Sequence, residues 1–305
     1  MTISASAVKE LRERTGAGML DCKNVLLEVE GDIEKAIDVL REKGLAKAAK
    51  KSGRIAAEGL VRIVITDAGD KAGIIEVNIE TDFASKNEGF IEFVDTLSAQ
   101  ILTTGMVELE AFMEEMYGGT GETIREKLTN FTATMGENVA VRRFEVFEET
   151  GVVYVGYLHL GGKIGVVVGI ETEASADEVE TLGKDIAMQV ASMNPQFVDE
   201  SCVDPAYIER EKEILVKQAL LEGKPAEIVE KMVMGRLKKE LKETCLLEQK
   251  FVKNSELTVA QYVSDSAKAL GKDARVVSMV RYEVGEGIEK KQENFAEEVA
   301  KQIQN

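Results

Sequence analysis

The sequence is poor in residues that build many active sites. Its 305 residues include no tryptophan, three prolines, three cysteines and a single histidine, His159. One imidazole cannot make a metal site of several histidines, and a Ser–His–Asp triad would have to use His159. The cysteines at positions 22, 202 and 245 are odd in number, widely separated and without a CxxC pair. They predict reduced thiols rather than disulfides or structural zinc, and we expect no bound metal and no cofactor.

Basic charge is also scarce. Lys and Arg total 38 against 55 Asp and Glu, which gives a net charge of −17. Nucleic-acid phosphates are bound by basic surfaces, so direct nucleic-acid binding is not expected. The longest apolar run, about residues 164–170, is far shorter than the roughly 20 residues that cross a bilayer, and the N-terminus lacks the apolar segment of a secretory signal. We therefore predict a cytoplasmic protein that does not contact membranes.

The first 55 residues have the pattern of a small helical bundle, called the head below. Ser4 or Ser6 can cap a first helix, residues 15–18 (TGAG) break it, and Gly31-Asp32 ends a second helix and starts a third. Residues 1–57 hold eleven Lys and Arg against nine Asp and Glu, so this part carries +2 while the rest carries −19. The head is therefore the cationic part of an acidic chain.

The middle of the chain alternates between strand and helix patterns. Residues 60–65 and 72–79 predict a hairpin, helical patterns follow at 87–103, 107–116 and 121–134, and a strand follows at 139–147. A second hairpin is predicted from strands at 152–158 and 164–171. The tetrapeptides at 79–82 (IETD) and 170–173 (IETE) are offset by 91 residues. This offset indicates two related halves, although strand composition alone can also produce such short similarities.

The last third begins with helix patterns. Residues 178–193 predict one helix, and 205–241 predict two charged helices joined at Gly223-Lys-Pro225, which make an antiparallel hairpin. A helix at 258–270, a strand at 274–284 and a polar helix at 292–303 complete the chain.

These elements predict an α+β fold with antiparallel sheets. About two domains are expected from the length, at roughly 150 residues each. The elements subdivide the chain more finely into an N-terminal three-helix domain (1–55), a first core subdomain (56–148), a second core subdomain (149–194 and 244–277), a protruding helical hairpin or coiled coil (195–243) and a C-terminal module (278–305).

Enzyme motifs are missing from the sequence. GxGxxG, a P-loop, HExxH and GxSxG do not occur, so no catalytic residue is predicted. His159 follows a strand beside a glycine turn and is interpreted as a structural or contact residue. The most unusual chemistry is a strand that ends in Glu80-Thr81-Asp82-Phe83. Phe83 either fills the core or projects with Asp82 as a tip that enters a partner, and composition alone favours the core.

Five segments together resemble the elongation factor Ts family. They are residues 11–23 (LRERTGAGMLDCK), 76–86 (EVNIETDFASK), 136–142 (GENVAVR), 223–225 (GKP) and 281–290 (RYEVGEGIEK). They occur in order over essentially the whole chain. The second segment departs from the family pattern at Ile79, which is usually a small residue, and at Ala84, which is usually valine.

The resemblance implies a guanine-nucleotide exchange factor for elongation factor Tu, with a ubiquitin-associated-like head, and not an enzyme. It implies that a tip perturbs the Mg²⁺ and phosphate site of GDP-loaded elongation factor Tu, that the head docks on the nucleotide-binding domain, and that the core makes a further contact. The residues concerned are Thr81, Asp82, Phe83 and Ala84 in the tip, Arg12, Met19 and Lys23 in the head, and His159 in the core.

Other interpretations stay open from the sequence. The head and the hairpin could serve a helical adaptor or holdase that binds partner proteins without nucleotide exchange. Glu80 and Asp82, two residues apart on a strand, could form the carboxylate pair of an acidic enzyme. The hairpin could also pack against a second copy of the chain and form a homodimer.

Overall fold

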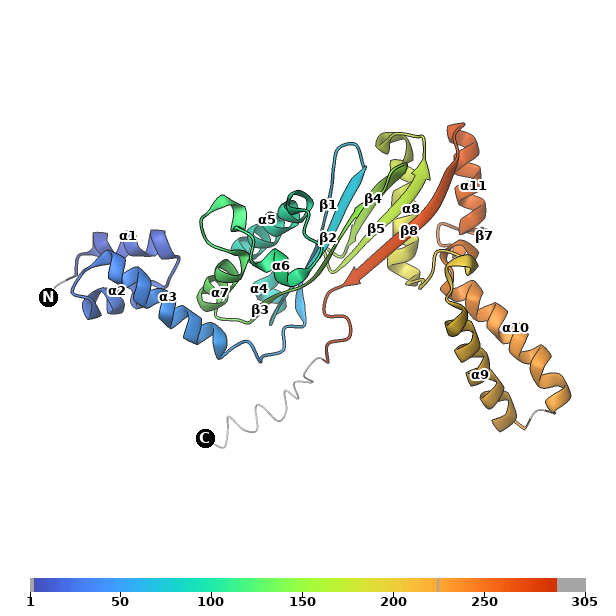
Figure 1. Ribbon diagram of the computed structural model, residues 1–305, viewed down its shortest axis with the longest axis horizontal. Coiled ribbons are helices and arrows are strands. Elements are labelled where there is room, and N and C mark those ends of the chain that lie inside the picture. The colour runs from blue at the N-terminus through green and yellow to red at the C-terminus, as the bar shows by residue number, and fades with distance from the viewer. Residues whose placement is uncertain (1–2, 224, 290–305) are drawn as a thin grey trace. The chain divides into compact units, whose positions relative to one another are not determined.

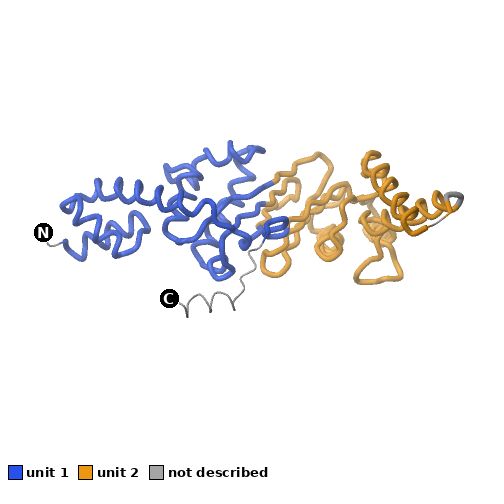
Figure 2. Tube along the Cα trace, turned by 90° about the horizontal axis from the view of Figure 1, so that it is seen from below, with its two compact units in different colours: residues 1–61, 75–144, 283–305 blue, residues 62–74, 145–282 orange. Residues whose placement is uncertain are grey.

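The computed structural model describes residues 3–223 and 225–289 (Figure 1). It confirms the predicted α+β class, because helical segments and antiparallel strands both make up the fold. The chain divides into two compact units (Figure 2). The first unit comprises residues 1–61, 75–144 and 283–305, and the second comprises 62–74 and 145–282. Each unit is described by itself.

The head is a bundle of three helices, as predicted. They are α1 (Ala5–Thr15), α2 (Met19–Glu28) and α3 (Ile33–Ala49). Ser4 caps α1 by accepting a hydrogen bond from the Ala7 amide at 3.2 Å, and Asp32 caps α3 by accepting one from Lys35 at 3.1 Å. Apolar side chains at helical spacing form a separate small core, whose fully buried members include Leu11, Cys22 and Leu26. The local capping signals and the apolar spacing therefore determine this bundle.

The first sheet consists of a strand hairpin and a third strand, and helices connect the hairpin to that strand. Its strands are β1 (Glu58–Ile65), β2 (Lys71–Ile79) and β3 (Val139–Glu148), with β2 in the centre. The segments between β2 and β3 are α4 (Asp82–Ser85), α5 (Glu88–Thr104), α6 (Leu109–Met113), a 3₁₀ turn η1 (Tyr117–Gly119) and α7 (Ile124–Met135). The central position explains why β2 is buried along nearly its whole length.

Helix α7 also packs on α3 of the head. The two helices approach closely at Gly44, where an added Cβ would lie 3.5 Å from the Cβ of Ala133. An ion pair between Arg41 and Glu126 joins the same two helices. Within the first unit, the third helix of the head is thus anchored on a helix of the core.

The second sheet repeats this strand order. Its strands are β4 (Val152–His159), β5 (Ile164–Thr172) and β8 (Ala274–Glu283), with β5 in the centre. Strands β4 and β5 pair antiparallel, from Val152 opposite Glu171 to His159 opposite Ile164. In both sheets the second strand of a hairpin is central and a distant segment adds the third strand. This shared order is what two related halves would produce.

Helices cover the second sheet and complete its core. Helix α8 (Ala176–Met193) packs against β4 and β5, and α11 (Val259–Leu270) follows the short strands β6 (Lys250–Phe251) and β7 (Asn254–Thr258) (Figure 1). Because residues up to 283 belong to β8, the predicted boundary at 278 falls inside a strand of this sheet. The predicted polar helix at 292–303 lies outside the described residues.

The helical hairpin consists of α9 (Pro205–Leu221) and α10 (Ala226–Thr244), which pack side by side (Figure 1). Two 3₁₀ turns flank it, η2 (Glu200–Cys202) and η3 (Leu246–Glu248). Pro225, expected in the first turn of the second helix, is the residue that precedes it. Two narrow apolar clusters hold the helices together, one including Leu237 and Leu241 and the other Val229 and Val233. In the described part of the chain, every helix is too short or too polar to cross a membrane.

Candidate functional site

The predicted tip lies where β2 passes into α4. Ile79, the last residue of β2, is fully buried, so the chain leaves the core directly before the tip. Thr81 is the N-cap of α4, and its hydroxyl accepts a hydrogen bond from the Ala84 amide at 3.2 Å. Asp82 and Phe83 therefore occupy the first turn of a short helix. The structure brings together all four residues predicted for the tip.

Phe83 projects from this turn instead of filling the core. Its side chain is 83% exposed, so the interpretation favoured by composition is wrong. The ammonium group of Lys86 lies 5.9 Å from the centre of the ring and 2.9 Å from a carboxylate oxygen of Asp82. An aromatic ring left in water forgoes the hydrophobic gain of burial. That gain remains available for a partner.

The base of the tip is held by residues from the turn between α7 and β3. The carboxylate of Glu137 accepts hydrogen bonds from the Thr81 amide at 3.0 Å and from the Thr81 hydroxyl at 2.8 Å. The backbone amide of Asn138 donates to the carboxylate of Glu80 at 2.6 Å. Sequence reasoning missed these two residues, because 56 positions separate Thr81 from Glu137. The only available signal was that both belong to the 136–142 segment that carries the family resemblance.

The head residues lie on two neighbouring helices. Met19 is the first residue of α2 and is 61% exposed, and Lys23 follows four positions later, so both lie on one face of that helix. Leu20, beside Met19, is also exposed. Arg12 is an exposed residue of α1. The head thus presents an apolar side chain together with cationic ones, which suits docking on a protein surface.

His159 belongs to the second unit and is the last residue of β4. Its Nδ1 lies 2.9 Å from the hydroxyl of Tyr157, two residues earlier on the same face of the strand. The turn that follows is led by Leu160, which is 71% exposed and adopts a positive φ of 50°. The partner of the imidazole is thus the phenol of Tyr157. In a Ser–His–Asp triad the partners would be a carboxylate and a serine, so this arrangement suits a contact residue better.

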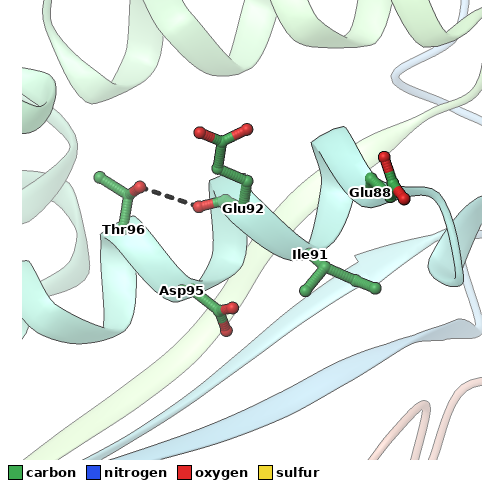
Figure 3. Close-up of a pocket in the computed structure, with 5 residues that line it drawn as sticks. All are labelled: Glu88, Ile91, Glu92, Asp95 and Thr96. Atoms are coloured by element: carbon green, nitrogen blue, oxygen red, sulfur yellow. Dashed lines mark hydrogen bonds between the residues drawn. The ribbon is translucent and has the colours of Figure 1, made fainter.

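The two carboxylates that could form an enzymatic pair have different neighbours. The carboxylate of Glu80 accepts from the Asn138 backbone amide at 2.6 Å and lies 3.5 Å from Arg54, whereas that of Asp82 lies 2.9 Å from Lys86. A shallow hollow on α5 is lined by Glu88, Ile91, Glu92, Asp95 and Thr96 (Figure 3). The Thr96 hydroxyl donates to the carbonyl of Glu92 at 2.8 Å, and none of the five residues is basic. Among the described residues, no three metal-ligating side chains cluster together.

Comparison with known proteins identifies the relatives of this chain. The family model described as "Elongation factor TS" matches residues 80–286. The chain is 57% identical over 301 residues to "Elongation factor Ts" of Clostridioides difficile (strain 630), with 99% of both chains covered. It is 50% identical over 303 residues to the protein of that name from Clostridium kluyveri, and 52% identical over 301 residues to that of Clostridium botulinum (strain Alaska E43 / Type E3), again with 99% of each chain covered.

Proposed function

This chain belongs to the elongation factor Ts family, and we propose that it is a guanine-nucleotide exchange factor that binds GDP-loaded elongation factor Tu and promotes GDP release during translation elongation. The observation that carries the proposal is the tip, where an exposed Phe83 stands on a turn fixed by hydrogen bonds. Membership in this family supports elongation factor Tu as the partner and a cytoplasmic location. The exposed Phe83, held on its turn by hydrogen bonds, supports the proposal that this chain perturbs the nucleotide site of the partner.

Exchange requires a difference in affinity rather than a covalent step. The factor must bind nucleotide-free elongation factor Tu more tightly than the GDP-loaded form, because binding of the factor and of GDP are reciprocally coupled. Each ~1.4 kcal/mol of that difference weakens GDP binding about tenfold. An enzyme-like acid–base pair has no part in this mechanism. The chain's own binding energy opens the nucleotide site.

The proposed roles of the tip follow from its chemistry. Phe83 would insert as a wedge between packed elements near the Mg²⁺ and phosphate site of the partner, where a rigid aromatic ring displaces other side chains. Asp82 would hydrogen-bond beside the wedge and disfavour the GDP-bound arrangement. Thr81 starts the turn that carries both residues, and the small Ala84 completes it. His159 would contact the partner separately.

The test is release of a fluorescent GDP analogue from elongation factor Tu, followed with and without the chain. The chain is expected to accelerate release in a saturable, concentration-dependent way. Binding of the two proteins, measured in parallel by calorimetry, shows whether they associate at all. Tight binding without accelerated release would contradict exchange and favour the adaptor interpretation.

A head variant should separate docking from exchange. Met19→Ala is expected to raise the chain concentration that gives half-maximal release about tenfold, because an exposed apolar contact of about 1.4 kcal/mol is lost. The rate constant at saturation should stay the same, because docking energy is common to both states of the partner. The matched control is Leu45→Ala, because Leu45 is also an exposed apolar residue and lies on α3. A lowered saturating rate constant with unchanged half-saturation would contradict the docking role.

A further inference from the structure

We infer that Glu137 is a positioning residue for nucleotide release: its carboxylate clamps the base of the tip, so that Phe83 meets the partner in one fixed orientation. The effect on release rests on the proposed function, whereas the clamp itself is a property of this chain alone. The clamp residues are Glu137 and Asn138 on one side and Glu80 and Thr81 on the other.

The first half of the clamp is a directional chain of hydrogen bonds. The Ala84 amide donates to the Thr81 hydroxyl, and that hydroxyl donates to one oxygen of Glu137 at 2.8 Å. The other oxygen of Glu137 accepts from the Thr81 amide at 3.0 Å. Hydrogen bonds to an ionised carboxylate are roughly twice as strong as neutral ones, and a hydroxyl that both donates and accepts is fixed in rotation. The first turn of α4 is therefore held at its N-cap.

The second half ties the adjacent residues. The Asn138 amide donates to the Glu80 carboxylate at 2.6 Å, and the Asn138 side chain donates to the carbonyl of Arg54 at 2.8 Å. Two consecutive residues on each side are thus linked, which prevents the tip from pivoting about a single hydrogen bond. The hydrogen bond to Arg54 also attaches the linker between α3 and β1 to this turn.

Glu137 itself lies in the short turn between α7 and β3. Helix α7 ends at Met135, and Gly136 reverses the chain with a φ of 79° while its amide donates to the carbonyl of Thr132 at 3.1 Å. Strand β3 begins at Val139, so only Gly136 and the two clamp residues Glu137 and Asn138 separate α7 from the first sheet. The helix that precedes the clamp, α7, also packs on α3 of the head.

A fixed base matters because the wedge has few contacts of its own. At 83% exposure, Phe83 depends on the backbone of α4 for its orientation. A mobile wedge would have to be ordered at the moment of binding, which lowers the part of the binding energy available to open the nucleotide site. Fixing the tip in advance is therefore expected to act on the saturating rate of release more than on docking.

The absence of tryptophan from the sequence gives a direct test of the clamp. Phe83→Trp places a single tryptophan on the tip, and time-resolved fluorescence anisotropy measures its nanosecond motion. Adding Glu137→Ala should at least double the amplitude of fast depolarisation, with little change in the unfolding temperature. The matched control is Glu110→Ala, which removes an exposed carboxylate paired with Arg125 at 2.7 Å and should leave the depolarisation unchanged.

Release of the fluorescent GDP analogue tests the consequence in the chain that keeps Phe83. Glu137→Ala should lower the saturating rate constant about tenfold and change the half-saturating concentration less, and Glu137→Gln, which keeps one acceptor oxygen, should fall between. Unchanged depolarisation, or increased depolarisation with an unchanged release rate, would overturn the inference. If Glu137→Ala does not fold, Glu137→Gln decides by the same two readouts. If the unmodified chain does not accelerate release, the proposed function fails, while the anisotropy still decides whether the clamp exists.

Discussion

Replacing Phe83 by alanine is expected to lower the saturating rate constant of GDP release from elongation factor Tu by about 30-fold. Truncation of an aromatic anchor in an interface costs about 2 kcal/mol or more, and each ~1.4 kcal/mol is a factor of ten. The unfolding temperature should hardly change, because the ring is 83% exposed and its removal leaves no cavity. Stopped-flow release and thermal unfolding of the same preparation measure the two effects.

The control for Phe83→Ala is Val107→Ala. Val107 is 75% exposed, belongs to the same unit and lies in the loop between α5 and α6. Its replacement should leave release unchanged, which separates a specific wedge from a general loss of exposed apolar surface. A Phe83→Ala variant that releases GDP as fast as the unmodified chain would remove the tip from the mechanism.

Replacing Glu76 by alanine is expected to cost about 3 kcal/mol of unfolding free energy, because it leaves the buried Gly285 amide and the buried Asn78 side chain without their acceptor and removes two ion pairs. Glu76 lies on β2 and is fully buried. Its carboxylate accepts from Arg143 at 2.7 Å, from Arg142 at 2.9 Å, from Asn78 at 3.1 Å and from the Gly285 amide at 2.8 Å. One side chain thus joins β2, β3 and the segment after β8, all within the first unit. Urea unfolding measures the cost.

The hydrogen bond to Glu76 requires glycine at position 285. The residue has a φ of 72°, and an added Cβ would lie 2.2 Å from the carbonyl oxygen of Ala57, so only glycine brings its amide to Glu76 without strain. The matched control is Glu148→Ala on β3, which removes an exposed ion pair with Lys71 at 3.0 Å. Its expected cost is below about 1 kcal/mol of unfolding free energy, as is usual for ion pairs at the surface. Equal losses for the two variants would contradict a special role for Glu76.

The same carboxylate predicts a pH dependence of stability. Burial alone raises the pKa of Glu76, but the hydrogen bonds from Gly285, Arg143, Arg142 and Asn78 outweigh it and bring the pKa below its ordinary value of 4.5. A group whose pKa is depressed by folding stabilises the native state above the unfolded pKa, and this contribution is lost as the pH falls through the lower folded value. The difference in unfolding free energy between the unmodified chain and Glu76→Gln should therefore be constant from pH 7 to about 5 and shrink below pH 4.5. A difference that grows on acidification would contradict this assignment.

The sequence by itself determined the features that depend on near neighbours. The head helices, the two strand hairpins and the helical hairpin were predicted because caps such as Ser4 and Asp32 act within three residues and because apolar spacing repeats every turn or every second residue. The family was also predictable, because continuous segments carry the resemblance, whereas the role of the tip residues stays a prediction. These signals need no knowledge of how distant parts meet.

Only the tertiary structure decided which distant residues meet and which side chains stay in water. Composition favoured a buried Phe83, yet in the structure Ile79 is fully buried and Phe83 is exposed. The contacts of Thr81 with Glu137 and of Glu76 with Gly285 span 56 and 209 positions. Similarly, β8 completes a sheet that begins more than a hundred residues earlier. Periodicity and capping report contacts within a few residues, whereas these hydrogen bonds form only once the fold has brought distant segments together.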